Sequence, residues 1–423
     1  MSRPTRTETI VHLGRHGDGV YESKEGPVYV RGALPGERVL VGLPAREKKI
    51  LRAKLERVEE QAPARRVDAC GSLERCGGCP FGHMTREAQC EVKKQWLLDA
   101  LRTQKVSAVD VEVVMPAPSD AYRTRARLQW RRGGLGYRES EGFEVVVPEH
   151  CGVLDARLEE ARLALASMRG VLKGEGEIRL SLTRFEGGEG VVAAFTSREA
   201  QSEPFYKALA SLIAQKALQG ATAQVGGAGA PTLYGDAMER SFDFDGRALE
   251  APVGSFRQAH RAATQELTSR VLAFGEVDGK KVLELFAGHG HFTAPIAARA
   301  SLVRAVELDA PAAKSLTQNL ARHQLKADVV ASDVVLALES LAKKKSYFDI
   351  IVLDPPRSGA LAAIEGIAQT RASRIVYVSC DAATFARDAA QLEARGYALS
   401  RLAMIDLFPD TLHAETVARF DKR

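Results

Sequence analysis

Hydrophobic and polar positions divide the chain into three stretches with different periods. The first stretch, residues 8–59, contains short runs of alternating apolar and polar positions separated by turns that are rich in glycine and proline. Alternation with a period of two is typical of strands that bury one face. So many short strands close together predict a small five-stranded β-barrel with an OB-like architecture, which often holds oligonucleotides.

The second stretch has a mixed pattern. It begins with a cysteine-containing loop over residues 70–79 and a predicted helix over residues 89–101. Predicted strands and helices then alternate: the strands cover residues 121–130, 178–182 and 190–195, and the helices cover residues 156–168 and 204–215. This pattern indicates a mixed α+β domain.

The third stretch begins after residue 262, where helical segments separate continuous apolar strands. These strands are expected over residues 282–285, 302–306, 327–330, 350–353 and 375–378. Such runs are typical of strands in a parallel sheet that helices cover on both faces. The chain is therefore predicted to be a multidomain α/β protein, with the barrel at residues 1–61, the central domain at 62–250 and a Rossmann-like domain at 251–423.

Composition narrows the class of protein only slightly. The 423 residues carry a formal net charge of +5, which fits a nucleic-acid partner but is also common among enzymes with neutral substrates. The N-terminus lacks the apolar run of a secretory signal, and no stretch of about 18 apolar residues could span a membrane. We therefore expect a cytoplasmic protein with no membrane partner.

A glycine-rich turn marks the predicted cofactor site. Residues 282–290 (VLELFAGHG) are a buried strand that runs into this turn before a helix. Thr293 stands where the third glycine of a dinucleotide motif would fall, which argues against a pyrophosphate-binding cofactor. Glu307, Asp333 and Asp354 follow the next three strands, so their carboxylates should point into one crevice. The alternative is that each acid caps the helix after its strand.

Three segments near the C-terminus form a specific pattern together: residues 353–359 (LDPPRSG), 376–381 (VYVSCD) and 413–416 (HAET). With these segments the chain resembles the RNA uracil-5-methyltransferases. The resemblance extends back over residues 256–258 (FRQ) and the turn at 286–292. It continues through the cysteine loop to an N-terminal domain that is similar to a TRAM barrel, an RNA-binding module, and so covers nearly the whole chain.

The resemblance implies a class I methyltransferase that uses S-adenosylmethionine and Cys380 as nucleophile. Carbon 5 of uracil is a poor nucleophile, whereas a thiolate that adds to carbon 6 creates an enolate whose carbon 5 can attack the methyl group. Glu415 would then remove the carbon 5 proton, with Asp354 and Arg357 beside the target base and the nucleophile. The alternatives are that Cys380 is a buried small hydrophobic residue and that Glu415 forms a surface ion pair.

The resemblance also implies the cofactor contacts, which would fall on Gln258, Phe286, His291, Glu307, Asp333 and Asp354. Some positions depart from the family pattern without removing a reacting group. Asparagine is frequent where His260, His291 and Asp381 stand, cysteine is frequent at Ala287, and glycine usually occupies the position of Leu412.

Four cysteines could bind a metal centre: Cys70, Cys76, Cys79 and Cys151. Zinc and a [4Fe-4S] cluster both accept four thiolates, and the spacing is not that of a zinc ribbon. Relatives with this spacing bind a [4Fe-4S] cluster, so the resemblance implies the cluster, with zinc as the alternative. Four protein ligands would leave no iron open for radical chemistry, which favours a structural or RNA-binding role. Cys90 has no partner in the motif and is interpreted as a packing residue.

Residues 122–138 combine six arginines with aromatic residues and no acid. Arg123, Arg125 and Arg127 would share one face of a strand and suit phosphates, and interleaved aromatics favour stacked bases. A solvated basic face is the alternative. The target uridine should be flipped into the pocket. Phe256 could stack on it or could be an ordinary core residue.

The barrel and cluster occur together in relatives that act on large-subunit ribosomal RNA. We therefore expect 23S rRNA as the substrate of a monomeric enzyme, with tRNA as the alternative. Three rival hypotheses remain: a cytosine-5 methyltransferase, a non-catalytic RNA-binding or RNA-folding protein, and a purely redox iron–sulfur protein. Cytosine-5 methyltransferases normally carry the cysteine after proline or threonine, whereas here Ser379 precedes Cys380.

Overall fold

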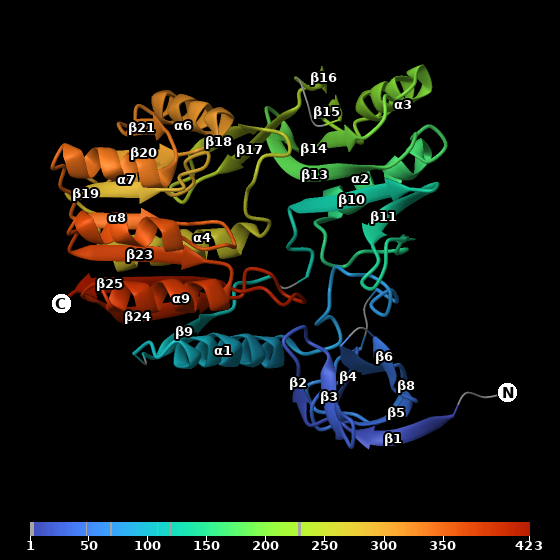
Figure 1. Ribbon diagram of the computed structural model, residues 1–423. Helices are drawn as coiled ribbons and strands as arrows, with labels where there is room; N and C mark the ends of the chain where they lie inside the picture. The colour runs from blue at the N-terminus through green and yellow to red at the C-terminus, as the bar shows by residue number, and fades with distance from the viewer. Residues whose placement is uncertain (1–3, 48, 68–69, 108, 119, 227–229) are drawn as a thin grey trace.

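The computed structural model describes residues 4–47, 49–67, 70–107, 109–118, 120–226 and 230–423, so residues 1–3 of the predicted barrel lie outside the described residues. Eight short strands form the N-terminal part (Figure 1): β1 (Thr5–Thr9), β2 (His12–Leu13), β3 (Gly19–Ser23), β4 (Gly26–Val30), β5 (Arg38–Gly42), β6 (Ala45–Glu47), β7 (Ile50–Ala53) and β8 (Leu55–Glu60). They pair in the orders β2-β3-β4-β7-β6 and β1-β5-β8 around one apolar core. The expected number of five strands was wrong because β2 has only two residues and β6 is exposed along its whole length, so neither produces an alternating pattern.

The central part contains a seven-stranded sheet in the order β12-β11-β10-β13-β14-β15-β16. Its strands are β10 (Arg125–Arg131), β11 (Gly134–Arg138), β12 (Val145–Val146), β13 (Gly176–Phe185), β14 (Gly188–Ser197), β15 (Gly220–Val225) and β16 (Thr232–Gly235). Helices α2 (Ala156–Ala164), η1 (Leu165–Met168) and α3 (Glu203–Ala214) contribute to the same core as the sheet. The helix predicted over 156–168 is therefore an α-helix that continues as a 3-10 turn.

The C-terminal part contains an eight-stranded sheet in the order β21-β20-β19-β22-β23-β25-β24-β9. The five predicted strands are present and parallel: β19 (Lys281–Leu285), β20 (Leu302–Glu307), β21 (Asp328–Ala331), β22 (Ile350–Leu353) and β23 (Arg374–Ser379). Three more strands extend the sheet beyond β23: β25 (Glu415–Lys422), β24 (Tyr397–Ile405) and β9 (Val111–Val114). β25 runs antiparallel to both β23 and β24, so the sheet is mixed and not purely parallel.

Helices cover both faces of this sheet (Figure 1). One core includes residues of α7 (Val334–Lys343), α8 (Ile364–Gln369) and α9 (Ala382–Glu393), and a second core includes residues of α4 (Arg261–Gly275) and α5 (Thr293–Ala297). Helix α6 (Ala310–Arg322) packs near β20 and β21, and the short 3-10 helix η2 (Leu361–Ala363) precedes α8. The hairpin of β17 (Met238–Phe242) and β18 (Ala248–Pro252) lies between the two large sheets, with contacts to β13 and α6.

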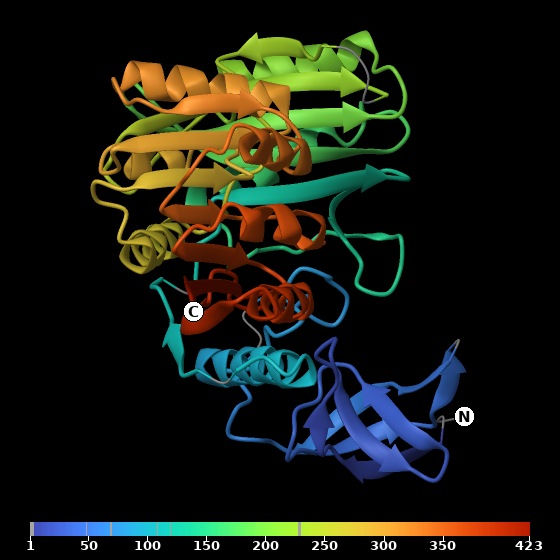
Figure 2. The same ribbon diagram turned by 60° about the vertical axis from the view of Figure 1, so that its left-hand side comes forward.

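Two elements that precede the central sheet in the chain pack on the C-terminal sheet. Helix α1 (Arg86–Thr103) lies against α9, and β9 pairs with β24 at the edge of the sheet, as Figure 2 also shows. Cys90 of α1 is buried in the core beneath α9, in agreement with its interpretation as a packing residue. Within the described ranges, no helix is both long and apolar enough to cross a membrane.

Replacement of Ile351 by alanine should destabilise the C-terminal sheet. Ile351 lies in the inner strand β22 and is fully buried. Truncation of a buried isoleucine leaves a cavity and costs about 2–5 kcal/mol. Urea unfolding followed by circular dichroism should show this loss. Leu336→Ala on α7, where the side chain is 60% exposed, is the control and should change stability by less than about 0.5 kcal/mol. Equal effects of the two substitutions would contradict the packing described above.

Candidate active site

The three C-terminal motifs meet at one edge of the sheet because of strand register. Leu353 is paired with Tyr377, so Asp354 and the end of β23 lie side by side at the carboxyl ends of parallel strands. Ser379 is paired with Thr416 across the antiparallel pair of β23 and β25, which places Cys380 next to Glu415. The nucleophile and base that the resemblance implies are thus neighbours, although they lie far apart in the sequence.

Burial dominates the electrostatics of this site. It raises the pKa of Cys380 to about 11, and the charges of Glu415 and Asp354 add to the shift. The side chain of Glu415 is almost completely buried, and burial together with the charge of Asp354 holds its pKa well above the usual range. Burial also raises the pKa of Asp354 to about 7. The alternative of a surface ion pair for Glu415 does not apply, because only 3% of the residue is exposed.

Arg357 is the cation that opposes these shifts. Its charge lowers the pKa of both Cys380 and Glu415, and so favours the thiolate and the carboxylate. Its Nη2 atom donates a hydrogen bond to Nε2 of His413 at 3.1 Å. Burial and the charge of Arg357 lower the pKa of His413 to about 4, so the imidazole is neutral at pH 7 and can accept this bond.

A buried carboxylate supports the loop that carries Arg357. Oδ2 of Asp388 accepts hydrogen bonds from the amide of Ala360 at 2.6 Å and from the hydroxyl of Tyr377 at 2.8 Å. Gly359 has a φ of 78°, and a Cβ atom there would lie 2.5 Å from the same oxygen. The sequence analysis missed Asp388, because one acid on a helix gives no sign that it faces inward.

The glycine turn after β19 is held by Glu307. Its Oε2 atom accepts a hydrogen bond from the amide of Gly288 at 2.8 Å, and Oε1 accepts one from the amide of Asp309 at 2.8 Å. Phe286, at the start of the turn, has a φ of 63°. The capping alternative applies to Asp333, whose Oδ1 atom accepts from the amide of Val335 at 2.8 Å at the start of α7. It does not apply to Glu307, because Asp309 caps the next helix.

Several polar atoms near this turn have no partner among the described residues. They include Oε1 of Gln258 and Oε2 of Glu284. His291 is engaged, because its Nε2 atom lies 2.8 Å from the hydroxyl of Thr268 on α4. Glu284 is 2% exposed, and burial and the charges of Asp354 and Glu307 raise its pKa to about 8. It was missed in the sequence, where its one signal is a charge inside an apolar strand.

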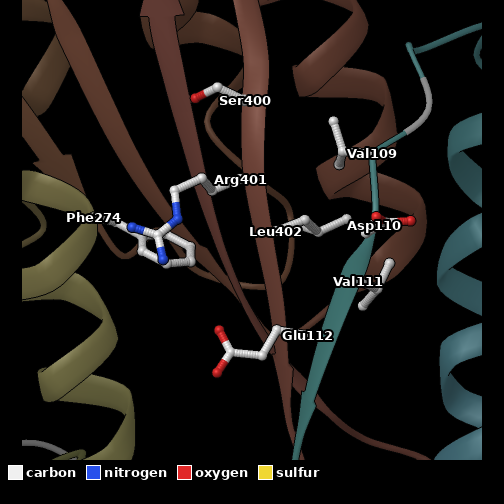
Figure 3. Close-up of a pocket in the computed structure, with 8 residues that line it drawn as sticks. All are labelled: Val109, Asp110, Val111, Glu112, Phe274, Ser400, Arg401 and Leu402. Carbon is white, nitrogen blue, oxygen red and sulfur yellow. The ribbon is translucent and has the colours of Figure 1, made fainter.

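A groove of about 710 Å³ lies elsewhere, between β9, β24 and α4 (Figure 3). None of the predicted site residues lines it. Glu112 in the groove is paired with Arg270 at 2.7 Å, and the guanidinium of Arg401 lies 4.3 Å from the ring centre of Phe274. Glu112 and Arg401 are thus engaged by neighbouring side chains, and the candidate active site is the edge at Cys380.

Three of the four predicted metal ligands lie close enough to affect one another. Burial raises the pKa of both Cys76 and Cys79, and the charge of Cys151 adds to each shift. Cys70 is partly buried. Among the residues that the structure describes, no three ligating side chains stand at metal-binding distances from each other. The donor set is chemically suited to a thiolate-bound centre.

The arginine-rich strand has two different faces. Ala126, Leu128 and Trp130 point into the core, whereas Arg127 on the opposite face is exposed. Tyr122 and Trp130 are each only 3% exposed, so the expectation that these aromatics stack on bases was wrong.

The arginines of this strand are not all available to phosphates. Arg127 is paired with Glu177, and Arg131 is paired with Glu175 at 2.6 Å. Arg125 is partly buried and donates to the carbonyl of Arg257 at 3.0 Å. These acids come from β13 and the residue before it, so the segment itself contains no sign of them.

Phe256 lies at the junction between the central and C-terminal parts. It is 79% exposed, so the alternative of an ordinary core residue does not apply. Arg125 and Arg257 both form ion pairs with the buried Glu239, with 3.5 Å between Arg125 Nη2 and Glu239 Oε2. These pairs fix the segment that carries Phe256. The segment therefore presents an aromatic ring to solvent on a fixed support.

The fold and site define a class of enzyme: an α/β protein of the kind that binds nucleotide-like cofactors, in which a candidate nucleophilic cysteine lies beside a buried carboxylate. Residues 232–423 match the family tRNA (Uracil-5-)-methyltransferase. Over 98% of its length, the chain is 32% identical to the 23S rRNA (uracil(1939)-C(5))-methyltransferase RlmD of Shewanella amazonensis, of which it covers 95%. It is also 32% identical to RlmD of Alkalilimnicola ehrlichii, over 98% of this chain and 96% of that protein.

The crystal structure of the Pyrococcus abyssi tRNA (uracil-54, C5)-methyltransferase in complex with S-adenosyl-L-homocysteine has the same fold. It superposes with a TM-score of 0.77 at 22% identity and covers 98% of this chain and 100% of that one. The chain belongs to the family of S-adenosylmethionine-dependent RNA uracil-5-methyltransferases.

Alkylation of Cys380 by iodoacetamide should be slow at neutral pH and should accelerate with rising pH. The reagent attacks the thiolate, and a pKa near 11 leaves little thiolate below pH 9. The rate should still increase between pH 9 and pH 10, where an unperturbed thiol levels off. Mass spectrometry of the peptide that contains Cys380 gives the rate. Arg357→Ala should slow alkylation further, because it removes the charge that lowers this pKa. A plateau below pH 8 would contradict the burial effect.

Proposed function

We propose that the chain methylates carbon 5 of the uridine in 23S rRNA that corresponds to position 1939, with Cys380 as nucleophile and Glu415 as base. The observation that carries the proposal is the placement of Cys380 beside the buried Glu415 by the register of β23 and β25. The choice of 23S rRNA rests on the RlmD proteins, which align with 98% of the chain. The family match and the Pyrococcus structure carry tRNA in their names, so tRNA is the second candidate substrate.

The chemistry requires the thiol of Cys380 to change its charge twice. The thiolate adds to carbon 6 of uracil, and the electron pair of the C5–C6 double bond makes carbon 5 nucleophilic. S-adenosylmethionine, when bound, supplies the methyl group that carbon 5 attacks. Glu415 then takes the proton from carbon 5, the double bond forms again, and the bond between sulfur and carbon 6 breaks to release the thiolate.

Arg357 supports both charged states in this scheme. Its guanidinium lowers the pKa of Cys380 before addition and the pKa of Glu415 before proton removal. The hydrogen bond to His413 holds the guanidinium at the edge of the site. Asp354 opposes ionisation of both groups through its own charge, and its raised pKa of about 7 reduces that effect at neutral pH.

For the cofactor, the binding residues that we propose surround the turn after β19: Gln258, Phe286, His291, Glu307, Asp333 and Asp354. The buried side-chain oxygens Oε1 of Gln258 and Oε2 of Glu284 have no hydrogen-bond partner among the described residues, and a polar group of a bound cofactor would satisfy them. We add Glu284 to the set for this reason. Glu307 would hold the glycine turn in place as well as contact the cofactor.

For RNA, we propose that the strands β1 to β8 form a TRAM-like binding module and that Phe256 stacks on the flipped target base. The exposed ring of Phe256 lies two residues before Gln258, on a segment held by Arg125. Stacking on an aromatic ring contributes about 1–3 kcal/mol per base. We further propose a cytoplasmic, monomeric enzyme.

Purified protein should transfer label from S-adenosylmethionine to 23S rRNA taken from a strain that lacks the gene. Nucleoside analysis should give 5-methyluridine, and mapping should place it at the position that corresponds to 1939. Cys380→Ala should reduce the rate by about a thousandfold or more, because it removes the nucleophile. Glu415→Gln should instead form an RNA adduct that survives denaturation, because addition proceeds without proton removal.

Other outcomes would select other functions. Label in tRNA alone would favour the second substrate, and label in 5-methylcytidine would favour a cytosine-5 methyltransferase. Full activity of Cys380→Ala would refute the proposed mechanism. RNA binding without any label, from protein that binds the cofactor, would favour the RNA-binding or RNA-folding hypothesis.

We also propose that Cys70, Cys76, Cys79 and Cys151 hold a [4Fe-4S] cluster, with zinc as the alternative. The support is the all-thiol donor set and the proximity of Cys151 to Cys76 and Cys79, since the charge of Cys151 raises the pKa of both. The centre would join the cysteine loop to the segment before α2 and so stabilise the approach of the central part to the barrel. No catalytic step is assigned to it.

Protein purified without oxygen should contain about four iron and four sulfide ions per chain, as four-thiolate ligation of this cluster requires. Cys79→Ser should lower the iron content strongly. Cys90→Ala is the matched control, because Cys90 is a buried thiol outside the set and its loss should leave the iron content unchanged. One zinc ion per chain and no iron would select the zinc alternative.

A further inference from the structure

We propose that Asp410 is a positioning residue for proton abstraction and that the N-terminal half of the chain acts through it on the active site. The inference rests on the proposed role of Glu415. It concerns the loop of residues 406–414, which joins β24 to β25 and contains His413. Ile405 and Glu415 are paired at the base of this loop, so the path of the loop determines where Glu415 and His413 lie.

Helix α1 holds the first residue of the loop. Asp406 is fully buried, with Nζ of Lys93 at 2.7 Å from Oδ1 and Nε of Arg86 at 3.0 Å from Oδ2. Nζ of Lys93 also donates to the carbonyl of Phe408 at 3.1 Å. Both cations precede the central sheet in the chain, so this end of the loop is held by a distant segment.

Asp410 is the hub in the middle of the loop. Its Oδ1 atom accepts hydrogen bonds from Nη2 of Arg66 at 2.6 Å and from Nε2 of Gln89 at 2.9 Å. Its amide donates to Oε1 of Gln89 at 2.8 Å, and its carbonyl accepts from the amide of Phe81 at 2.9 Å. The φ of Asp410 is 66°, a left-handed conformation that is unfavourable for most side chains and persists when its surroundings hold it.

The end of the loop touches the barrel. Leu412 belongs to an apolar cluster with Leu34 of the barrel and with Phe81 and Met84 of the segment before α1. A Cβ atom on Gly17 would lie 3.0 Å from Cδ2 of Leu412, so the turn before β3 abuts the residue that precedes His413.

The central part adds one contact, from the buried hydroxyl of Tyr122 to the carbonyl of Pro409 at 3.0 Å. The barrel, the segment before α1, α1 itself and the central part therefore converge on the loop, whereas Arg357 follows β22 and Cys380 follows β23. The two groups of the reaction have partly different supports: both lie at the edge of the sheet, but the loop that leads into Glu415 is also held by the N-terminal half. A displaced loop should therefore slow proton removal from carbon 5 more than it slows formation of the bond between Cys380 and carbon 6.

Asp410→Asn tests this directly. Asparagine keeps the shape and tolerates the left-handed conformation, but it removes the charge that Arg66 and Gln89 contact. Under single-turnover conditions with labelled S-adenosylmethionine and unmodified 23S rRNA, release of 5-methyluridine should fall about tenfold or more, since small misplacements cost this much. The fraction of protein in an RNA adduct that survives denaturation should rise several-fold over wild type, and the Kd for S-adenosylmethionine should not change.

The control is Asp421→Asn, at the far end of the same hairpin. Asp421 accepts from the hydroxyl of Ser400 at 2.6 Å and from Nε of Arg419 at 2.7 Å, so the substitution removes a comparable carboxylate without touching the loop. It should release product at the wild-type rate. Leu412→Ala, which loosens the contact with the barrel, should give the same adduct accumulation as Asp410→Asn. It replaces Asp410→Asn as the test if that variant does not fold.

The proposal is overturned if the loop variants release product at the wild-type rate. It is also overturned if their slower release comes without adduct or together with weaker cofactor binding, which would indicate a general structural defect. Parallel assays of Glu415→Gln and of the wild-type protein distinguish failure of the positioning role from failure of the proposed function. If neither forms adduct or 5-methyluridine, both proposals fall. If Glu415→Gln accumulates adduct and the loop variants do not, only the positioning role is refuted.

Discussion

The antiparallel pairing of β25 with β23 is the constraint on which the candidate site depends. In a purely parallel sheet, the strand beside β23 would also have its carboxyl end at this edge. Its first residue would then lie at the opposite edge, far from Cys380. Because β25 runs in the opposite direction, its first residue, Glu415, starts where β23 ends. The candidate nucleophile, Cys380, and the candidate base, Glu415, thereby become neighbours.

Burial gives these neighbours their chemical character. Cys380, Glu415, Asp354 and Glu284 lie at or near one edge, and burial raises the pKa of each. In water, four such groups would carry nearly three negative charges at pH 7, and their mutual repulsion would be costly. Partial protonation relieves that repulsion, and the charge of Arg357 opposes the effect of burial on the pKa of Cys380 and of Glu415.

The sequence predicted the inner strands well, because β19, β22 and β23 are buried on both faces and appear as uninterrupted apolar runs. It did not predict β9, whose four residues include the exposed Glu112, or the pairing of β25 between β23 and β24, which depends on contacts far apart in the chain. Motifs located Cys380 and Glu415, but Glu284 and Asp388 acquire their roles only through burial. The basic segment illustrates the opposite error, since the acids that neutralise Arg127 and Arg131 come from another strand.

The supports of the 406–414 loop explain why a long N-terminal half accompanies a compact catalytic sheet. Buried ion pairs such as Lys93 with Asp406 contribute little net stability, because desolvation of the charges offsets their attraction. Such pairs restrict position: a carboxylate that must meet two cations, as Asp406 does, has few acceptable positions, whereas an apolar contact tolerates sliding. A loop held mainly by apolar packing would leave the chain that leads into Glu415 less fixed, although strand pairing holds the backbone of Glu415 itself. Fixed polar contacts from elements outside the sheet restrict motion of the loop.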